Sequence, residues 1–284
     1  MTAAARQPTA TAFVPGHITG FFSAHPAPKP ARAGSRGAGI ALSDGVEVTV
    51  TPGSGVRLNG ETIEMPPVDS VCTRLGIDAA VDATTSLPLG AGFGVSGALA
   101  LGTALAANAV FDRGKTENEL ITLAHCAEVE AGTGLGDVVA QARGGLPIRI
   151  EPGSPSHGRL NGLSARPRIE YATFGELSTE SVLSGDTDEL TRAGESALSQ
   201  LLEWPTVKRF ITASQGFAAE AGLLTDEVAA AIDAVDAVGG DTDTGAAMAM
   251  LGNTVFAIGE GLSAAGYDAQ QCQVDTGGAR LRDT

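Results

Sequence analysis

Basic and aromatic residues are both scarce in this chain of 284 residues. It has 18 lysines and arginines against 33 aspartates and glutamates, which gives a net charge of −15, and aromatic residues make up only 4%. The only lysines are Lys29, Lys115 and Lys208. An acidic surface is repelled by nucleic acid and by anionic membranes, so neither is an expected partner. Acidic, lysine-poor surfaces also resemble those of proteins from salt-loving organisms, where ions screen the self-repulsion, and we expect such a source.

The chain also lacks paired cysteines and long apolar runs. Its three cysteines, Cys72, Cys126 and Cys272, form no CxxC pair. This pattern argues against a zinc site and predicts small buried thiols in a reducing cytoplasm. No run of 18 apolar residues occurs, and residues 1–11 contain no apolar segment. We therefore expect neither a membrane span nor a signal peptide, and we expect residues 1–11 to be a frayed extension.

The periodicity of the apolar residues predicts an α/β (α+β) fold in two parts, 1–155 and 156–284. A strand is expected over 46–51, with 56–59 as its hairpin partner, and another over 146–150. The segment 151–167, which is rich in Pro, Gly, Ser and Asn, indicates a loop or a domain boundary. Helices are expected over 96–110, from Thr116 onward, and at about 187–202, 206–221 and 225–237; strands are expected near 169–174, 254–258 and 270–275. The helix from Thr116 has the capping box Thr116-x-x-Glu119.

The most informative segment runs from Pro88 to Ala98 and reads Pro-Leu-Gly-Ala-Gly-Phe-Gly-Val-Ser-Gly-Ala. A glycine-rich loop that opens a helix directs backbone N–H groups and the helix dipole at an anion such as phosphate. Glycine admits positive φ and keeps no Cβ between the backbone and the anion. Ser96 would lie in the first helical turn, where its hydroxyl could reach a phosphate or a metal ion. Taken alone, the loop could equally be a tight strand–turn–helix corner.

Two familiar nucleotide-binding patterns fit this segment poorly. A Walker loop needs Gly-x4-Gly-Lys-Ser/Thr, and no lysine stands nearby. The Rossmann fingerprint matches by letter as Gly92-x-Gly94-x-x-Gly97, but it should follow a hydrophobic strand. Residues 82–88 are polar and end in proline, which makes a poor buried strand. An oxidoreductase that binds NAD is therefore a distant alternative.

A third pattern, that of the GHMP kinase superfamily, fits almost position for position. Its phosphate loop reads Pro-x3-Gly-Leu-Gly-Ser-Ser-Ala, which the segment from Pro88 to Ala98 resembles. The resemblance assigns phosphate binding to six residues: Pro88, Gly90, Gly92, Gly94, Ser96 and Gly97. It implies a two-part kinase fold, with an N-terminal half similar to the second domain of ribosomal protein S5 and a ferredoxin-like C-terminal half. The active site would lie in the cleft between the halves.

A second region supports the same resemblance. Residues 127–137 read Ala-Glu-Val-Glu-Ala-Gly-Thr-Gly-Leu-Gly-Asp. In the superfamily a helix carries a magnesium-binding glutamate, and the loop that follows presents an aspartate near the attacking hydroxyl. Glu128 shares the helix face of Leu120 and points inward, so we favour it over Glu130 as the Mg²⁺ ligand, together with Ser96. Asp137 would accept the hydroxyl proton or hold the hydroxyl in line. The alternative for this region is a solvated acidic helix end.

A third region, residues 13–22, reads Phe-Val-Pro-Gly-His-Ile-Thr-Gly-Phe-Phe. Together with the loop that ends at Asp137, it resembles the archaeal branch of the superfamily that phosphorylates pantoate. The resemblance implies ATP and Mg²⁺ as cofactors, transfer to the primary hydroxyl of pantoate, a step toward coenzyme A, and a homodimer. Candidate residues for the acceptor pocket are His17, Ser23, Arg149 and Thr179. A guanidinium pairs well with a carboxylate, although Arg149 could instead form a surface ion pair with Glu151.

Several alternatives stay open from the sequence. A kinase for homoserine, mevalonate or a sugar would share the phosphate loop, and a non-catalytic relative could bind nucleotide only. Read alone, His17 is more simply a loop histidine satisfied by its neighbours. The superfamily's third motif is a glycine-rich loop before a strand, but residues 248–256 here keep few glycines, so we assign no site residue there and expect the methionines to fill the core. An adenine pocket is expected between about 50 and 75.

Overall fold

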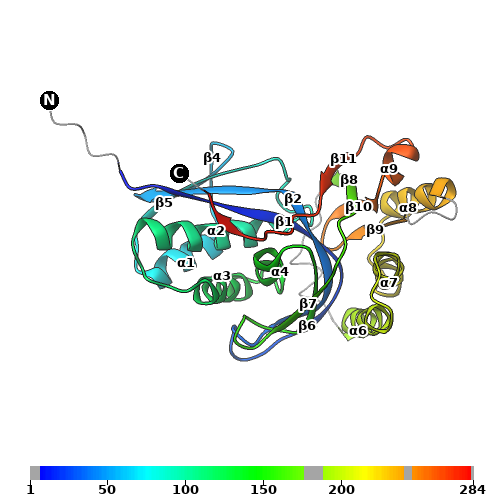
Figure 1. Cartoon of the computed structure of the whole chain (residues 1–284), viewed down its shortest axis with the longest axis horizontal. Coiled ribbons are helices and arrows are strands. Elements are labelled where there is room, and N and C mark those ends of the chain that lie inside the picture. The colour runs from blue at the N-terminus through cyan, green and yellow to red at the C-terminus, as the bar shows by residue number, and fades with distance from the viewer. Residues whose placement is uncertain (1–6, 176–187, 240–244, 283–284) are drawn as a thin grey trace.

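The computed structural model describes residues 7–175, 188–239 and 245–282 and contains two antiparallel-rich sheets with helices packed on them (Figure 1). The larger sheet has the order β12-β1-β2-β5-β3-β4, and β6 and β7 extend it from β2. Its strands are β1 (Ala10–His25), β2 (Gly34–Pro52), β3 (Val56–Leu58), β4 (Glu61–Ile63), β5 (Ala79–Thr85), β6 (Leu146–Glu151), β7 (Arg159–Leu163) and β12 (Arg280–Leu281).

Four helices cover one face of the larger sheet (Figure 1). They are α1 (Pro66–Leu75), α2 (Val95–Val110), α3 (Glu117–Ala131) and α4 (Asp137–Arg143). The central helix, α2, is apolar around most of its circumference because it packs against β1, β2 and the other three helices. Gly102 lets it lie close to the sheet, since a Cβ at that position would collide with the side chain of Val48.

The smaller sheet has the order β11-β8-β10-β9. Its strands are β8 (Arg168–Gly175), β9 (Gly245–Ala249), β10 (Asn253–Ile258) and β11 (Gln270–Gln273), and its helices are α6 (Asp188–Glu203), α7 (Val207–Glu220), α8 (Asp226–Gly239) and α9 (Gly261–Ala264). None of the helices in the described part of the chain has both the length and the apolar character needed to cross a bilayer.

The long strands β1 and β2 join the two parts. They pair antiparallel from Ala10 opposite Val50 to His25 opposite Gly34. Both strands contact α2, and both also contact α6, which belongs to the second part. Because both faces of β1 are covered, its residues are buried without the usual alternation. This strand therefore carries residues 13–22 through the middle of the molecule.

Most of the expected helices and strands are confirmed, including the capping box, in which the Glu119 amide donates to the Thr116 hydroxyl. Three expectations are wrong. Residues 56–59 do not form a hairpin with 46–51, because β3 pairs with β4 and with β5. The extension expected over 1–11 overlaps β1, which begins at Ala10. Of the two interpretations of 151–167, the loop is wrong because the segment contains β7, and the domain boundary stays a prediction. The division after residue 155 stays a prediction; the change from one sheet to the other falls between β7 and β8.

Candidate active site

The glycine-rich segment forms the connection from β5 to α2. Gly90, Gly92 and Gly94 have φ angles of 77°, 88° and 62°, which residues with a Cβ rarely adopt. The first backbone hydrogen bond of α2 runs from the Ala98 amide to the Gly94 carbonyl (3.0 Å). The amides of the three preceding residues therefore have no partner within the helix and, with the helix dipole, suit an anion.

Four of the six residues expected to hold phosphate border one cavity: Gly90, Gly92, Gly94 and Ser96. The other two lie beside it. Pro88 is exposed where the loop begins. Gly97 faces α4, where a Cβ would lie 3.2 Å from the Gln141 Oε1 atom, so its small size lets the two helices approach. The cavity has a volume of about 510 Å³.

Ser96 and Glu128 lie next to each other although they are far apart in sequence. The Ser96 hydroxyl donates to Glu128 Oε2 (3.1 Å), and the Thr133 hydroxyl donates to Oε1 (2.9 Å). Burial raises the pKa of Glu128 to about 7, against the two hydroxyl donors, which act to lower it. Glu130 instead lies at the surface and pairs with Arg74. The inward orientation expected for Glu128 is confirmed.

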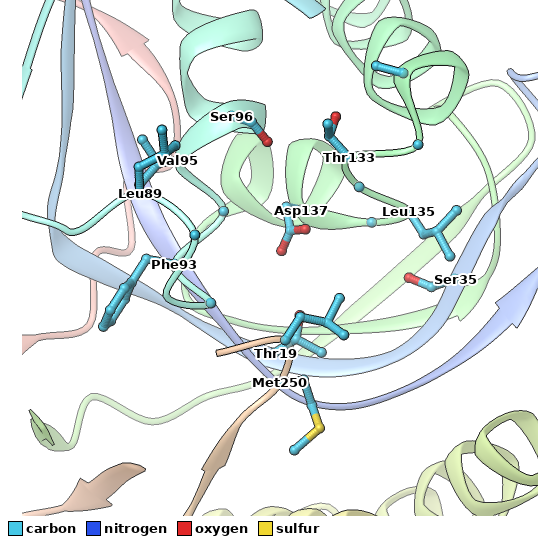
Figure 2. A pocket seen from close by; sticks show the side chains of 18 of the residues that line it. Thr19, Ser35, Leu89, Phe93, Val95, Ser96, Thr133, Leu135, Asp137 and Met250 are labelled. Atoms are coloured by element: carbon cyan, nitrogen blue, oxygen red, sulfur yellow. The ribbon is translucent and has the colours of Figure 1, made fainter. Parts of the chain in front are cut away.

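Asp137 begins α4 and points its carboxylate into the space between Ser96 and Thr19 (Figure 2). His17 Nδ1 lies 2.7 Å from Asp137 Oδ1. Burial acts to raise the pKa of Asp137, but the hydrogen bond from His17, together with the charge of Arg149, holds that pKa below its usual range. The carboxylate is therefore ionised at neutral pH and can accept a hydrogen bond from a hydroxyl group.

Arg149 is buried in the wall of the same cavity. Its Nε donates to the Ser35 hydroxyl (3.1 Å), and its Nη1 has no hydrogen-bond partner among the described residues. The surface ion pair with Glu151 that the sequence left open is wrong, because Glu151 pairs with Arg159 at 2.9 Å. A buried guanidinium with an unpaired donor is an unsatisfied cation, so it suits an anionic ligand such as a carboxylate.

Two other residues expected in the acceptor pocket, His17 and Ser23, do not line the cavity. His17 is fully buried beneath Asp137. Ser23 is also buried, bonds to His25 (2.9 Å between Ser23 Oγ and His25 Nε2) and lies beside α6. Thr179 lies outside the described residues.

Several lining residues escaped the sequence analysis: Thr19, Ser35, Met250 and Leu251. Thr19 lies two residues from His17, a spacing that shares a face of a strand, but the sequence did not predict that strand. Ser35, Met250 and Leu251 come from segments brought in by tertiary packing. Nothing in their local pattern marks them.

The turn between β9 and β10, where the third motif would lie, supports the phosphate loop. The Met250 amide donates to the Thr19 carbonyl (2.8 Å), and the Thr254 hydroxyl donates to the Ala91 carbonyl (2.9 Å). A Cβ on Gly252 would overlap the Ala91 carbonyl, so this one glycine is required for contact with the loop. Leu251 adopts a φ of 66°, the region where a glycine is usually found.

These residues fit a magnesium-bound nucleoside triphosphate. Backbone amides at the start of α2 suit its phosphates, and the adjacent oxygens of Ser96 and Glu128 suit Mg²⁺, which takes one or two protein carboxylates and completes its shell with phosphate and water oxygens. Glu64, Met65 and Pro66 border the cavity within the range expected for the adenine pocket. The fold and this site together define the class of GHMP kinases, and a family model described as the GHMP kinases N terminal domain matches residues 68–145.

Relatives that match most of the chain identify the branch of this class. The chain is 33% identical to the pantoate kinase of Methanocaldococcus jannaschii over 254 residues, which cover 87% of this chain and 91% of that kinase. It is 35% identical to the pantoate kinase of Thermococcus kodakarensis over 264 residues, which cover 87% of this chain and 86% of that kinase. A solved structure titled "Phosphotransferase related to CoA biosynthesis pathway" is 30% identical, with a TM-score of 0.85. The match covers 96% of this chain and 98% of the solved one. The chain belongs to the pantoate kinase family.

Proposed function

We propose that this chain transfers the γ-phosphoryl group of ATP to the primary hydroxyl of pantoate, giving 4-phosphopantoate and ADP in coenzyme A biosynthesis. The observation that carries the proposal is that the phosphate loop, Asp137 and Arg149 border a single cavity. An anion-binding loop, an ionised carboxylate and a buried cation are the three groups that a hydroxy-acid kinase needs. The names of the relatives support pantoate as the hydroxy acid.

Each residue has a role that follows from its surroundings. The backbone amides at the start of α2 would hold the phosphates, and Ser96 and Glu128 would hold Mg²⁺, which when bound neutralises phosphate charge. Asp137 would orient the hydroxyl of pantoate and accept its proton. Arg149 would pair with the carboxylate at the other end of pantoate. Phosphoryl transfer requires mainly positioning and charge neutralisation, and these residues supply both.

The proposal includes the conditions in which the enzyme works: high salt, a reducing cytoplasm and a dimeric state. The excess of acidic over basic residues supports activity at high salt, and three free cysteines support a reducing cytoplasm. A homodimer is supported by the resemblance to related kinases alone.

Release of ADP from ATP and Mg²⁺ tests the proposed function. The assay is run in high KCl with pantoate, pantothenate, homoserine and mevalonate as parallel acceptors. We expect turnover with pantoate and none above background with the other three. Turnover with another acceptor but not with pantoate would keep the kinase class and contradict the substrate. Nucleotide binding without turnover with any of the four would contradict the kinase activity that we propose.

The raised pKa of Glu128 predicts that magnesium–nucleotide binding weakens in acid. A protonated carboxyl cannot ligate Mg²⁺, and with a pKa of about 7 the ionised fraction falls as the pH drops below 7. Affinity for Mg²⁺ with a non-hydrolysable ATP analogue is expected to fall about fivefold between pH 7 and pH 6 through this group alone, by proton linkage. Titration calorimetry at both pH values measures it.

Two variants isolate that effect. Glu128→Gln has no titrating carboxyl, so its remaining pH dependence reports the nucleotide's own protonation and is subtracted. Glu130→Gln, on the exposed side of α3, should keep the full pH dependence. Equal pH dependence in wild type and Glu128→Gln would show that Glu128 does not ligate the ion.

A further inference from the structure

His17 lies directly after a β-bulge in β1. The pairing with β2 shifts between Pro15, opposite Gly45, and His17, opposite Ala41. A bulge bends a strand and re-aims the side chains next to it. The His17 amide also donates to the Phe93 carbonyl (2.9 Å), so the residue is tied to the phosphate loop by its backbone and to Asp137 by its ring.

The two ring nitrogens of His17 have opposite surroundings. Nδ1 lies 2.7 Å from Asp137 Oδ1, whereas Nε2 has no hydrogen-bond partner among the described residues. A Cβ on Gly39 would overlap Nε2, so the ring lies against the backbone of β2. A proton on Nε2 would be a buried, unpaired donor, whereas a proton on Nδ1 meets the carboxylate. The surroundings thus favour a neutral ring with its proton on Nδ1.

Substrate can reach Asp137 but not His17. The Asp137 side chain is 25% exposed and that of His17 is 0% exposed. The His17 ring contacts one carboxylate oxygen and leaves Oδ2 for an incoming hydroxyl. Two other charged groups lie near this carboxylate: Arg149 on β6 and Glu128 on α3. Neither forms a hydrogen bond with it, so among the described side chains His17 is the one that fixes its orientation.

We infer that His17 is a positioning residue: through its Nδ1–H it holds the Asp137 carboxylate toward the acceptor hydroxyl, and it does not bind the acceptor itself. This inference rests on the proposed function, since it assigns a role within the proposed reaction. It replaces the pocket role that the sequence suggested for His17.

Three substitutions test the inference. The amide nitrogen of asparagine can occupy about the position of Nδ1, whereas that of glutamine reaches about the position of Nε2. His17→Ala is expected to lower kcat roughly 10- to 100-fold, as removal of an orienting partner does, with KM for pantoate and ATP changed by no more than about twofold. His17→Asn should restore most of kcat and His17→Gln should not. The exposed His157→Asn is the matched control and should keep full activity.

The outcomes separate positioning from the other roles. A raised KM for pantoate with unchanged kcat would show that His17 binds the substrate and overturn the inference. Equal losses in His17→Asn and His17→Gln, both folded by circular dichroism, would also overturn it. His17→Ala added to Asp137→Asn should cause no further loss, because the two residues act as a unit.

A spectroscopic readout does not depend on turnover. Nitrogen-15 NMR of the His17 ring should show a protonated Nδ1 and an unprotonated Nε2 in the wild-type protein. Should the protein turn over none of the acceptors, this tautomer still tests the hydrogen bond. A protonated Nε2 would contradict the inference, while absent turnover with the expected tautomer would contradict only the proposed function.

Discussion

Replacing Asp137 by asparagine is expected to lower kcat for pantoate phosphorylation by about 10²- to 10⁴-fold, the range that a positioned general base contributes. Asparagine keeps the shape of the side chain, and its amide oxygen can still accept from His17 Nδ1. The variant therefore removes the negative charge and the proton acceptor and little else. Steady-state kinetics at saturating ATP and pantoate measure the loss.

A matched control excludes a general effect of lost charge. Asp226 is exposed at the start of α8 and does not border the cavity. Asp226→Asn should keep kcat within about twofold, since surface substitutions are usually near neutral. If Asp137→Asn retained most of kcat with unchanged affinity for ATP, Asp137 would not be the proton acceptor.

Local patterns predicted much of the secondary structure, for identifiable reasons. The helix over 96–110 is apolar throughout and follows a glycine loop, and the helix from Thr116 carries a capping box; both signals act within a few residues. The strand β1 escaped prediction because it is buried on both faces and contains proline and glycines, so it shows no alternation. The pairing of β3 was wrong because proximity in sequence favours a hairpin with β2, whereas the sheet places β5 between them.

The residues of the candidate site also differ in whether local sequence could predict them. Ser96, Glu128 and Asp137 were named from short motifs, and the structure brings them close together. Thr19, Ser35 and Met250 border the cavity only because β1, β2 and the turn after β9 meet there, which depends on contacts between segments distant in the sequence. His17 was named as a candidate for the acceptor pocket, because the sequence shows the residue but not that its ring turns toward Asp137.

The second sheet also acts on the phosphate loop, which no motif indicated. The Phe93 ring of that loop packs edge-on against Tyr171 of β8, with ring centroids 4.9 Å apart. The Thr254 hydroxyl of β10 holds the Ala91 carbonyl. The glycine-poor third motif thus has a structural role: Gly252 packs against the backbone of the phosphate loop, and the Thr254 hydroxyl bonds to it.

Replacing Arg149 by methionine is expected to raise KM for pantoate by about 10- to 100-fold, because a hydrogen-bonded contact to a charged group contributes about 1.5–3 kcal/mol. The KM for ATP should change little. Methionine has a similar length and no charge, and removing a buried cation that has an unpartnered nitrogen relieves its desolvation cost. The melting temperature of Arg149→Met should therefore not fall, so the loss of affinity will not reflect unfolding. Arg159→Met, at an exposed position, is the control for loss of an arginine.

An analogue of pantoate whose carboxylate is replaced by a hydroxymethyl group completes the test. It lacks the group that Arg149 would bind, so wild-type enzyme should use it poorly, and Arg149→Met should lower its kcat/KM little further. The penalty of the substitution is then specific to the carboxylate, as a double-mutant cycle between protein and ligand requires. If Arg149→Met instead impaired pantoate and the analogue equally, or raised KM for ATP, the guanidinium would be acting on the phosphates or on Asp137. Arg149 is buried near Asp137, and its Nη1 has no hydrogen-bond partner among the described residues. We therefore expect the penalty to be specific to the carboxylate of pantoate.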